Sequence, residues 1–477
     1  MKRIVSKMSS NPELLQSLTW SHAHESELFE RFLQILCIPS ISNDPEHAPE
    51  MRRCAEWLCS ELARIGLKGC EILESGGSPF VYGEWLEAGD ERPVVLIYAH
   101  YDVMPVNPLD AWDSSPFAPA VRNGRLYARG AIDDKCGVSI SLAALESMLS
   151  AEGRLPLNVK VLFDGEEEQG SPHIAPFIAA HKAQLAADLL VVSDGGGTPG
   201  QPQAMASVRG TVDAEVIIRG PRSDLHSGLY GGVVHNPIHR VGELIASLHD
   251  GDGRVRIPNF YDDVRPPTLA EQAILVDSEP AMMQRARQET GRTTFWGEAL
   301  GTYALRATAL PTCDVNGVWG GYQGPGTKTV IPAAAGIKLS LRIVPNQDPR
   351  KIMLSLCAFA ANFASSTLDV EVVPGAANWP ATLLHSGPVF AQLQQAYAAA
   401  WGVQAQLYRV GGSVPFIGHA QQLLALPAID LGFGVGSNAH APNEYLELEY
   451  FRKGIDTALH FYYGIAALPR AVWHERP

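Results

Sequence analysis

Short apolar runs alternate with a helix-like stretch in the first half of this chain. The helix-like stretch covers residues 138–150, and the apolar runs that we predict as strands are residues 80–85, 94–99, 157–163 and 189–193. Strands that alternate with helices form a largely parallel sheet, because a parallel connection needs a crossover that is usually a helix. The pattern therefore predicts an α/β fold in which helices flank a mostly parallel sheet, with ligands beyond the carboxyl ends of its strands.

Helical periodicity also precedes the first predicted strand. Apolar residues recur three and four positions apart between residues 25 and 65, which is the spacing of one face of a helix. We therefore expect helices in this segment. The apolar residues of their two stripes are Leu28, Phe32, Ile35 and Leu36, then Met51, Cys54, Leu58 and Leu62.

The pattern changes after residue 204. A chain of 477 residues is too long for one compact core, and here we predict strands of alternating polarity, one helix and a long irregular stretch. They cover residues 208–219 and 336–344 (strands), 237–249 (helix) and 250–311 (irregular). Helical periodicity returns at residues 383–402. We therefore expect a discontinuous first domain, residues 1–207 and 383–477, interrupted by an inserted α+β domain, residues 208–382.

The composition narrows the classes of partner. The formal net charge of −14 argues against binding to nucleic acid or to an anionic membrane surface. No apolar run reaches the roughly 20 residues that span a bilayer, and residues 1–16 contain no apolar segment of a secretory signal. We therefore expect a cytoplasmic protein.

The tripeptide His100-Tyr101-Asp102 follows the second predicted strand directly. Its two polar residues are two positions apart, so at a strand end both side chains point to the same side. An imidazole there can bind a metal ion, and a carboxylate can orient the imidazole. Alone, the motif is more typical of an ordinary surface pair.

Four further acidic or histidine-containing clusters make a metal site the better interpretation. They are residues 129–135, 163–171, 191–197 and 440–444. Divalent cations accept mixed shells of imidazole and carboxylate, and one bridging carboxylate can hold two of them about 3.5–4 Å apart. Each cluster alone has an ordinary explanation as a turn or a helix start, whereas all five together predict a centre for two metal ions.

The order of these clusters resembles the co-catalytic di-metal peptidase family that includes carnosinase, acetylornithine deacetylase and glutamate carboxypeptidase. The shared order is His-x-Asp, a bridging Asp before a Lys-containing turn, Glu-Glu with Gly-Ser, Ser-Asp, and a late His. The resemblance covers almost the whole chain. The stretch Pro325-Gly326-Thr327-Lys328-Thr329-Val330-Ile331-Pro332, followed by Arg342, is most similar to the cytosolic nonspecific dipeptidases and carnosinases of this family.

The resemblance implies a metal-binding role for five residues. Asp133 would bridge two divalent ions, with His100 and Asp194 completing one shell and Glu168 and His440 the other. Zn²⁺ is the expected metal, with Mn²⁺ or Co²⁺ as alternatives.

The resemblance also implies the acid–base residues. The triplet Glu166-Glu167-Glu168 leaves the register open on physical grounds, and the family pattern selects Glu167 as the general base that activates a metal-bridged water. Asp102 would orient His100 by a hydrogen bond.

The resemblance also implies residues that bind the substrate. Arg342, with Gly412 and Ser413, would bind the terminal carboxylate of the substrate, since a guanidinium pairs with a carboxylate through two parallel hydrogen bonds. His226, as a donor to the oxyanion, and Thr329 would reach the active site of the partner subunit. The resemblance therefore implies a homodimer, in which the inserted domain acts as a lid and dimerisation domain.

We therefore predict a metal-dependent dipeptidase that cleaves the amide bond of small unblocked dipeptides. A deacylase of N-acyl amino acids would use the same metals and Arg342, and nothing in the sequence identifies a residue that recognises the free amine of a dipeptide. A non-catalytic binding protein of the same fold predicts a broken ligand set, whereas every ligand position and Glu167 are intact.

Overall fold

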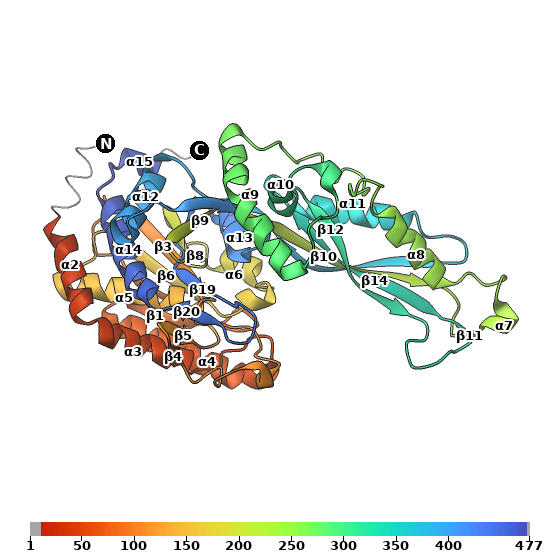
Figure 1. The fold of residues 1–477 in the computed structure, drawn as a ribbon, viewed down its shortest axis with the longest axis horizontal. Helices are drawn as coiled ribbons and strands as arrows, with labels where there is room; N and C mark the ends of the chain where they lie inside the picture. The colour runs from red at the N-terminus through yellow and green to blue at the C-terminus, as the bar shows by residue number, and fades with distance from the viewer. Residues whose placement is uncertain (1–10, 475–477) are drawn as a thin grey trace. The chain divides into compact units, whose positions relative to one another are not determined.

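The computed structural model describes residues 11–474 and divides the chain into two compact units (Figure 1). The first unit contains the described residues up to Ala206, then Leu383–Tyr408, and the chain from His419 onward. The second unit contains Ser207–Thr382 and Arg409–Gly418. In the part of the chain that the structure describes, we find no helix with both the length and the hydropathy of a membrane span.

A six-stranded mixed sheet forms the centre of the first unit, in the order β1-β2-β6-β3-β7-β18. The last four strands in this order are parallel to one another, and β1 and β2 are antiparallel to their neighbours. This confirms the predicted α/β fold with a mostly parallel sheet. The strands are β1 (Lys68–Leu73), β2 (Phe80–Trp85), β3 (Val94–His100), β6 (Asn158–Asp164), β7 (Leu189–Val192) and β18 (Ala428–Asp430).

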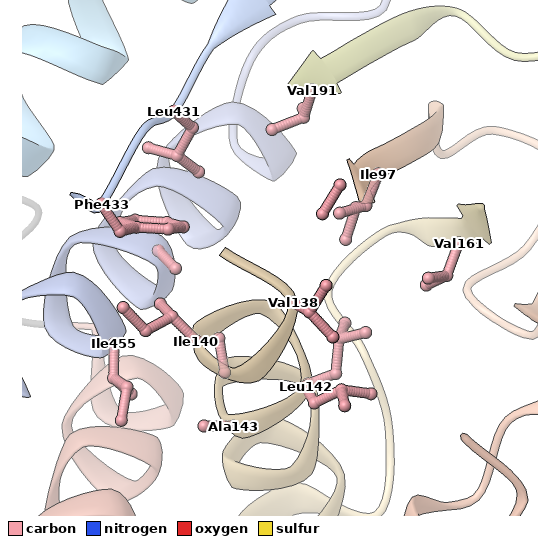
Figure 2. Close-up of a cluster of buried hydrophobic side chains, with 14 of the residues drawn as sticks. Ile97, Val138, Ile140, Leu142, Ala143, Val161, Val191, Leu431, Phe433 and Ile455 are labelled. Carbon is pink, nitrogen blue, oxygen red and sulfur yellow. The ribbon is translucent and has the colours of Figure 1, made fainter. Parts of the chain in front are cut away.

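Helices of the first unit pack around this sheet, as the apolar periodicity predicts. The apolar stripes of α3 and α4 are buried, and α5 is buried on nearly every side. Figure 2 shows why α5 is buried on more than one side: Val138 lies toward the sheet residue Ile97, and Ile140 lies on the side of Phe433. The helices are α2 (Pro12–Ala23), α3 (Glu25–Leu36), α4 (Ala48–Ile65), α5 (Lys135–Glu152), α6 (Ile174–Ala180), α12 (Gly387–Trp401), α14 (Glu449–Ala466) and α15 (Ala471–His474).

A second group of short strands forms further strand pairs in this unit. They join segments from both ends of the chain: β8 pairs in parallel with β19, and β20 pairs with β5. These strands are β4 (Ala120–Arg122), β5 (Arg125–Tyr127), β8 (Gly196–Thr198), β9 (Gln201–Val208), β17 (Gln406–Arg409), β19 (Gly434–Ser437) and β20 (Tyr445–Glu447). Helix α13 (Pro415–Leu424) begins in the second unit and ends in the first.

The second unit is built on a four-stranded antiparallel sheet, in the order β12-β14-β10-β15. Along β14 every second side chain is buried, and these residues pack with helices α8 and α11. The alternate residues, including Arg342, lie on the other, polar face. The elements are β10 (Gly210–Arg219), β12 (Thr312–Gly320), β14 (Ala334–Ile343), β15 (Asp369–Asn378), α8 (Pro237–Ser247) and α11 (Pro349–Ala361).

Smaller elements complete the second unit. A two-stranded ladder joins β11 to β13, and short β16 pairs with the end of β9. These elements are β11 (Leu225–His226), α7 (Ser227–Tyr230), α9 (Leu269–Thr290), α10 (Tyr303–Thr308), β13 (Val330–Ile331) and β16 (Ala381–Thr382).

The prediction of an irregular stretch at residues 250–311 is wrong for its middle part. The 22-residue helix α9 lies there. Two of its apolar residues, Leu269 and Val276, are exposed, and Pro280 lies inside the helix. These features remove the apolar stripe by which helices are recognised. A capping box between Thr268 and Glu271 marks its start and was the usable signal.

Candidate metal centre

Three neighbouring strands of the first unit end at one acidic cluster. β3 ends at His100, and Asp194 follows the end of β7 by two residues. The turn with Glu167 and Glu168 follows β6. Because β6, β3 and β7 are parallel neighbours, their carboxyl ends meet at the same edge of the sheet.

Asp133 links two histidines at the centre of this cluster. Its Oδ1 atom lies 3.0 Å from Nε2 of His100, and its Oδ2 atom lies 2.8 Å from Nε2 of His440. His440 also lies 3.1 Å from Oε2 of Glu168. The structure therefore brings all five predicted ligands together, with Asp133 shared between His100 and Asp194 on one side and Glu168 and His440 on the other.

The donor set fits a pair of divalent cations. In each group of three residues, the potential ligand atoms lie within 4.8 Å of one another, and imidazole with carboxylate is a donor set that Zn²⁺ and Mn²⁺ accept. The Oε1 atom of Glu168 is buried without a hydrogen-bond partner. Burial raises the pKa of Glu168 to about 7 and that of Asp194 to about 6. Such crowded, buried carboxylates favour a bound cation.

The three consecutive glutamates separate into different roles by their contacts. The carboxylate of Glu166 is buried and turned to another part of the unit: its Oε1 accepts hydrogen bonds from the Ser78 N–H at 2.9 Å and approaches Nδ1 of His173 at 2.9 Å. Burial raises the pKa of Glu167 well above its ordinary value, as suits a proton acceptor. The contacts of Glu166 thus remove it from the open register, and Glu167 as the base stays a prediction.

Asp102 contacts more of the centre than the sequence indicated. Nδ1 of His100 lies 3.1 Å from the Asp102 carbonyl oxygen and 3.3 Å from its carboxylate. The same carboxylate accepts hydrogen bonds from the N–H groups of Glu167 (3.2 Å) and Glu168 (3.1 Å) and from the Ser42 hydroxyl (2.6 Å). Asp102 therefore holds both the imidazole and the glutamate turn in place.

Glu444 was not identified as a site residue from the sequence, although it ends one of the quoted clusters. It is fully buried and pairs with Arg129 at 2.6 Å. It also accepts hydrogen bonds from the N–H groups of Gly130 (3.1 Å), Ile132 (2.9 Å) and Asp133 (3.3 Å). One carboxylate thereby fixes the backbone that presents Asp133.

Close backbone packing explains the glycines after Asp194. A Cβ atom on Gly196 would lie 1.7 Å from the carbonyl oxygen of Gly434, and one on Gly197 would lie 2.6 Å from that of Gln201. Only glycine allows such an approach. The strand pairing of β8 with β19 therefore ties the Asp194 loop to the C-terminal part of the first unit.

The predicted carboxylate-binding residues meet within the second unit. Nη1 of Arg342 donates to the Ser413 hydroxyl at 2.9 Å. The preceding carbonyl, that of Gly412, accepts a hydrogen bond from the Arg209 N–H at 2.9 Å. Arg209 was missed by sequence reasoning, because a lone arginine between two strands carries no motif.

His226 lies in the small β11–β13 ladder of the second unit, and Thr329 directly precedes β13. His226 is opposite Val330, and the Ser227 N–H donates to the Thr329 carbonyl at 3.1 Å. Both side chains are exposed. The ring of His226 accepts a hydrogen bond from the Gly228 N–H at 3.0 Å, so their function across a dimer stays a prediction.

Comparison with known proteins identifies a family model and relatives that match this chain over most of their length. The model of peptidase family M20/M25/M40 matches residues 96–463. The Cys-Gly metallodipeptidase of Candida albicans is 29% identical over 91% of this chain and 94% of its own length. The beta-Ala-His dipeptidase of Rattus norvegicus is 25% identical over 93% of this chain and 94% of its own length.

A solved structure agrees with the sequence matches. The M20 family metallo-carboxypeptidase of Sulfolobus solfataricus superposes with a TM-score of 0.83 at 30% sequence identity. The match covers 93% of this chain and 100% of that protein. The similarity therefore extends over nearly the full length of both chains.

Proposed function

This chain belongs to peptidase family M20/M25/M40, and we propose that it is a dipeptidase that hydrolyses the amide bond of small unblocked dipeptides with two divalent metal ions. Membership confirms the resemblance predicted from the sequence, and the protein is a metallopeptidase. The observation that carries the finer proposal is the sharing of Asp133 between two groups of potential ligands, His100 with Asp194 and Glu168 with His440.

The metal-binding residues and the general base have different tasks in the reaction. Bound divalent cations supply polarisation of the scissile carbonyl and a lowered pKa of water. Glu167 accepts the proton of the attacking water and then delivers it to the nitrogen of the leaving amine, so a single carboxylate acts as base and then as acid. Its raised pKa in the buried site supports the first of these steps, because a stronger base accepts a proton more readily.

Substrate recognition is assigned to the second unit. Arg342 binds the terminal carboxylate of the dipeptide, with Gly412 and Ser413 beside it. The hydrogen bond from Arg342 to the Ser413 hydroxyl supports this proposal, because it fixes the guanidinium before substrate arrives. A preorganised guanidinium loses less entropy when it forms a bidentate pair.

We also propose a homodimer in which His226 and Thr329 complete the active site of the partner. Exposed apolar side chains follow His226 along the chain and support this proposal: Leu229 is 74% exposed, Tyr230 43% and Val233 82%. Apolar residues gathered beside a functional group are typical of a protein interface. Mass measurement in solution tests it, and a monomer with full activity would contradict it.

A substrate panel tests the proposed reaction. The protein is loaded with Zn²⁺, Mn²⁺ or Co²⁺ in turn, its metal content is measured, and hydrolysis of glycyl-leucine is compared with that of N-acetyl-leucine. Release of leucine from the free dipeptide is the expected result. Activity on the acetylated compound alone would instead establish an N-acyl-amino-acid deacylase.

A further inference from the structure

Two arginines converge on the loop Gly411-Gly412-Ser413 of the second unit. Arg342 reaches Ser413 through its side chain, and Arg209 reaches the two glycines. Nε of Arg209 donates to the Gly411 carbonyl at 2.7 Å, and its backbone N–H donates to the Gly412 carbonyl at 2.9 Å. One residue thus binds two successive carbonyls of this loop.

The loop is shaped to receive the Arg209 side chain. A Cβ atom on Gly411 would lie 3.2 Å from Nη2 of Arg209 and 2.7 Å from the Ala307 carbonyl oxygen. Any larger residue at position 411 would therefore collide with the backbone at Ala307 and press on the guanidinium. The guanidinium also reaches the Leu310 carbonyl at 3.4 Å.

The two positive charges are not neutralised by an ion pair. Among the side chains described in residues 11–474, no carboxylate forms a salt bridge with Arg209 or Arg342. Burial lowers the pKa of Arg209 to about 10, and the charge of Arg342 contributes in the same direction while Asp314 opposes it. Arginine stays protonated at neutral pH, so two like charges share this part of the unit at a cost in stability.

We propose that Arg209 is a specificity-determining residue that holds the Gly411–Ser413 loop against Arg342 and adds a second positive charge there, so that this site selects substrates ending in a free carboxylate. The inference rests on the proposed peptidase function and extends it. Arg209 acts through the loop and through its charge, and it is therefore a positioning residue. An arriving carboxylate offsets the repulsion that the two guanidinium groups feel in the free protein.

A neighbouring arginine provides a matched control. Arg409 lies two residues before Gly411, but its guanidinium pairs with Glu271 at 3.1 Å, and Glu271 pairs with Arg265 as well. Arg409 therefore ties the end of β17, the strand that leads into this loop, to Glu271 and contributes no unpaired charge. The variant Arg409→Gln measures what the loss of loop support alone does.

The test compares glycyl-leucine with glycyl-leucinamide in the metal-loaded full chain. The readout is the ratio of kcat/KM for the acid to that for the amide, which does not depend on the fraction of active protein. Arg209→Gln keeps a hydrogen-bond donor and loses the charge, so we expect this ratio to fall about 10- to 100-fold, mainly through KM. Arg209→Lys keeps the charge but loses the Nε hydrogen bond to Gly411, so its ratio should lie above that of Arg209→Gln and within about tenfold of the wild-type ratio.

The possible outcomes are distinct. A fall of the ratio in Arg209→Gln, with recovery in Arg209→Lys and no change in Arg409→Gln, supports the proposal. An equal loss on acid and amide in Arg209→Gln overturns it. If Arg209→Gln does not fold, Arg209→Lys decides alone, since a lysine variant that loses the acid preference contradicts the role of charge.

A second measurement needs no turnover and so separates this inference from the proposed function. The melting temperature of the full chain is followed with L-leucine and with L-leucinamide. Wild type should be stabilised by leucine more than by leucinamide, and Arg209→Gln should lose that difference. Failure of the wild type to cleave dipeptides would refute the peptidase proposal, whereas an unchanged leucine effect in Arg209→Gln would refute the role of Arg209.

Discussion

The first unit gathers negative charge in one buried place, and the second unit gathers positive charge. In the first, carboxylates crowd around the imidazoles of His100 and His440; they belong to Asp102, Asp133, Glu167, Glu168 and Asp194. In the second, Arg209 and Arg342 share one loop without a carboxylate partner in the described part of the chain. Burial raises the pKa of Glu167, Glu168 and Asp194 and lowers that of Arg209, so both arrangements penalise the ionised form of these groups.

The difference between the units indicates the ligand that each one binds. An excess of carboxylate groups in a partly buried site is relieved by a cation, and an excess of guanidinium groups is relieved by an anion. A dipeptidase needs both: cations at the scissile bond and a partner for the terminal carboxylate. The net charge of the whole chain, −14, cannot reveal this division, since it sums over both units.

Asp133→Asn should have the largest effect on metal binding by the carboxylate cluster of the first unit. Asp133 is the only residue shared by both groups of potential ligands found among the described residues, so we expect loss of both metal ions and at least a 10⁴-fold fall in kcat/KM. Metal content by mass spectrometry and dipeptide hydrolysis check this. The exposed-pair variant Asp456→Asn is the control, and retention of two metals by Asp133→Asn would refute the shared position.

Glu167→Gln should distinguish the carboxylate that transfers the proton from the carboxylates that bind metal. We expect a fall in kcat of about 10²- to 10⁴-fold with metal content unchanged, because an amide cannot accept the proton of water. Hydrolysis and metal content are measured on the same sample. Wild-type turnover in this variant would remove Glu167 from the mechanism.

Glu444→Gln should weaken the negative site without removing any ligand. The carboxylate holds Arg129 and the backbone around Asp133, and outer residues of this kind typically contribute about 10- to 100-fold in metal affinity. Calorimetric titration of the metal-free protein with Zn²⁺ measures it. Glu447→Gln, which removes the nearby pair with Arg125, is the matched control, and equal affinities in both variants would argue against a role for Glu444.

The smallest expected effect is on the free energy of unfolding at acid pH. It concerns His419, a buried residue of the first unit that is not one of the predicted metal ligands. Burial lowers the pKa of His419 to about 4 from 6.5. The unfolded chain therefore binds the extra proton first, so stability is intact above pH 6.5 and is lost as the pH falls toward 4, by about 3 kcal/mol at most. His419→Gln should flatten urea-unfolding stability across this window, and an unchanged slope would contradict this assignment.

The strands and their terminal ligands could be predicted because each is a local pattern. An apolar run followed by His or Asp is visible within ten residues, as at Val94–Asp102. Glu444 and Arg209 could not be predicted, since their roles depend on partners far away in sequence: Glu444 binds the N–H of Gly130, which lies 314 positions earlier. Helix α9 was missed because its exposed apolar residues show no stripe.

Residues late in the sequence determine when the metal centre can form during synthesis. The strand β19 pairs with β8, and Glu444 accepts a hydrogen bond from the Asp133 N–H. A nascent chain that has emerged through the second unit already contains His100, Asp133, Glu168 and Asp194, but it lacks His440, Glu444 and the Gly434 strand. The second group of ligands, Glu168 and His440 with Asp133, is therefore complete only after residue 440 has left the ribosome. Catalytic competence therefore comes after synthesis of the second unit, and a chain still emerging at that stage carries only one of the two ligand groups.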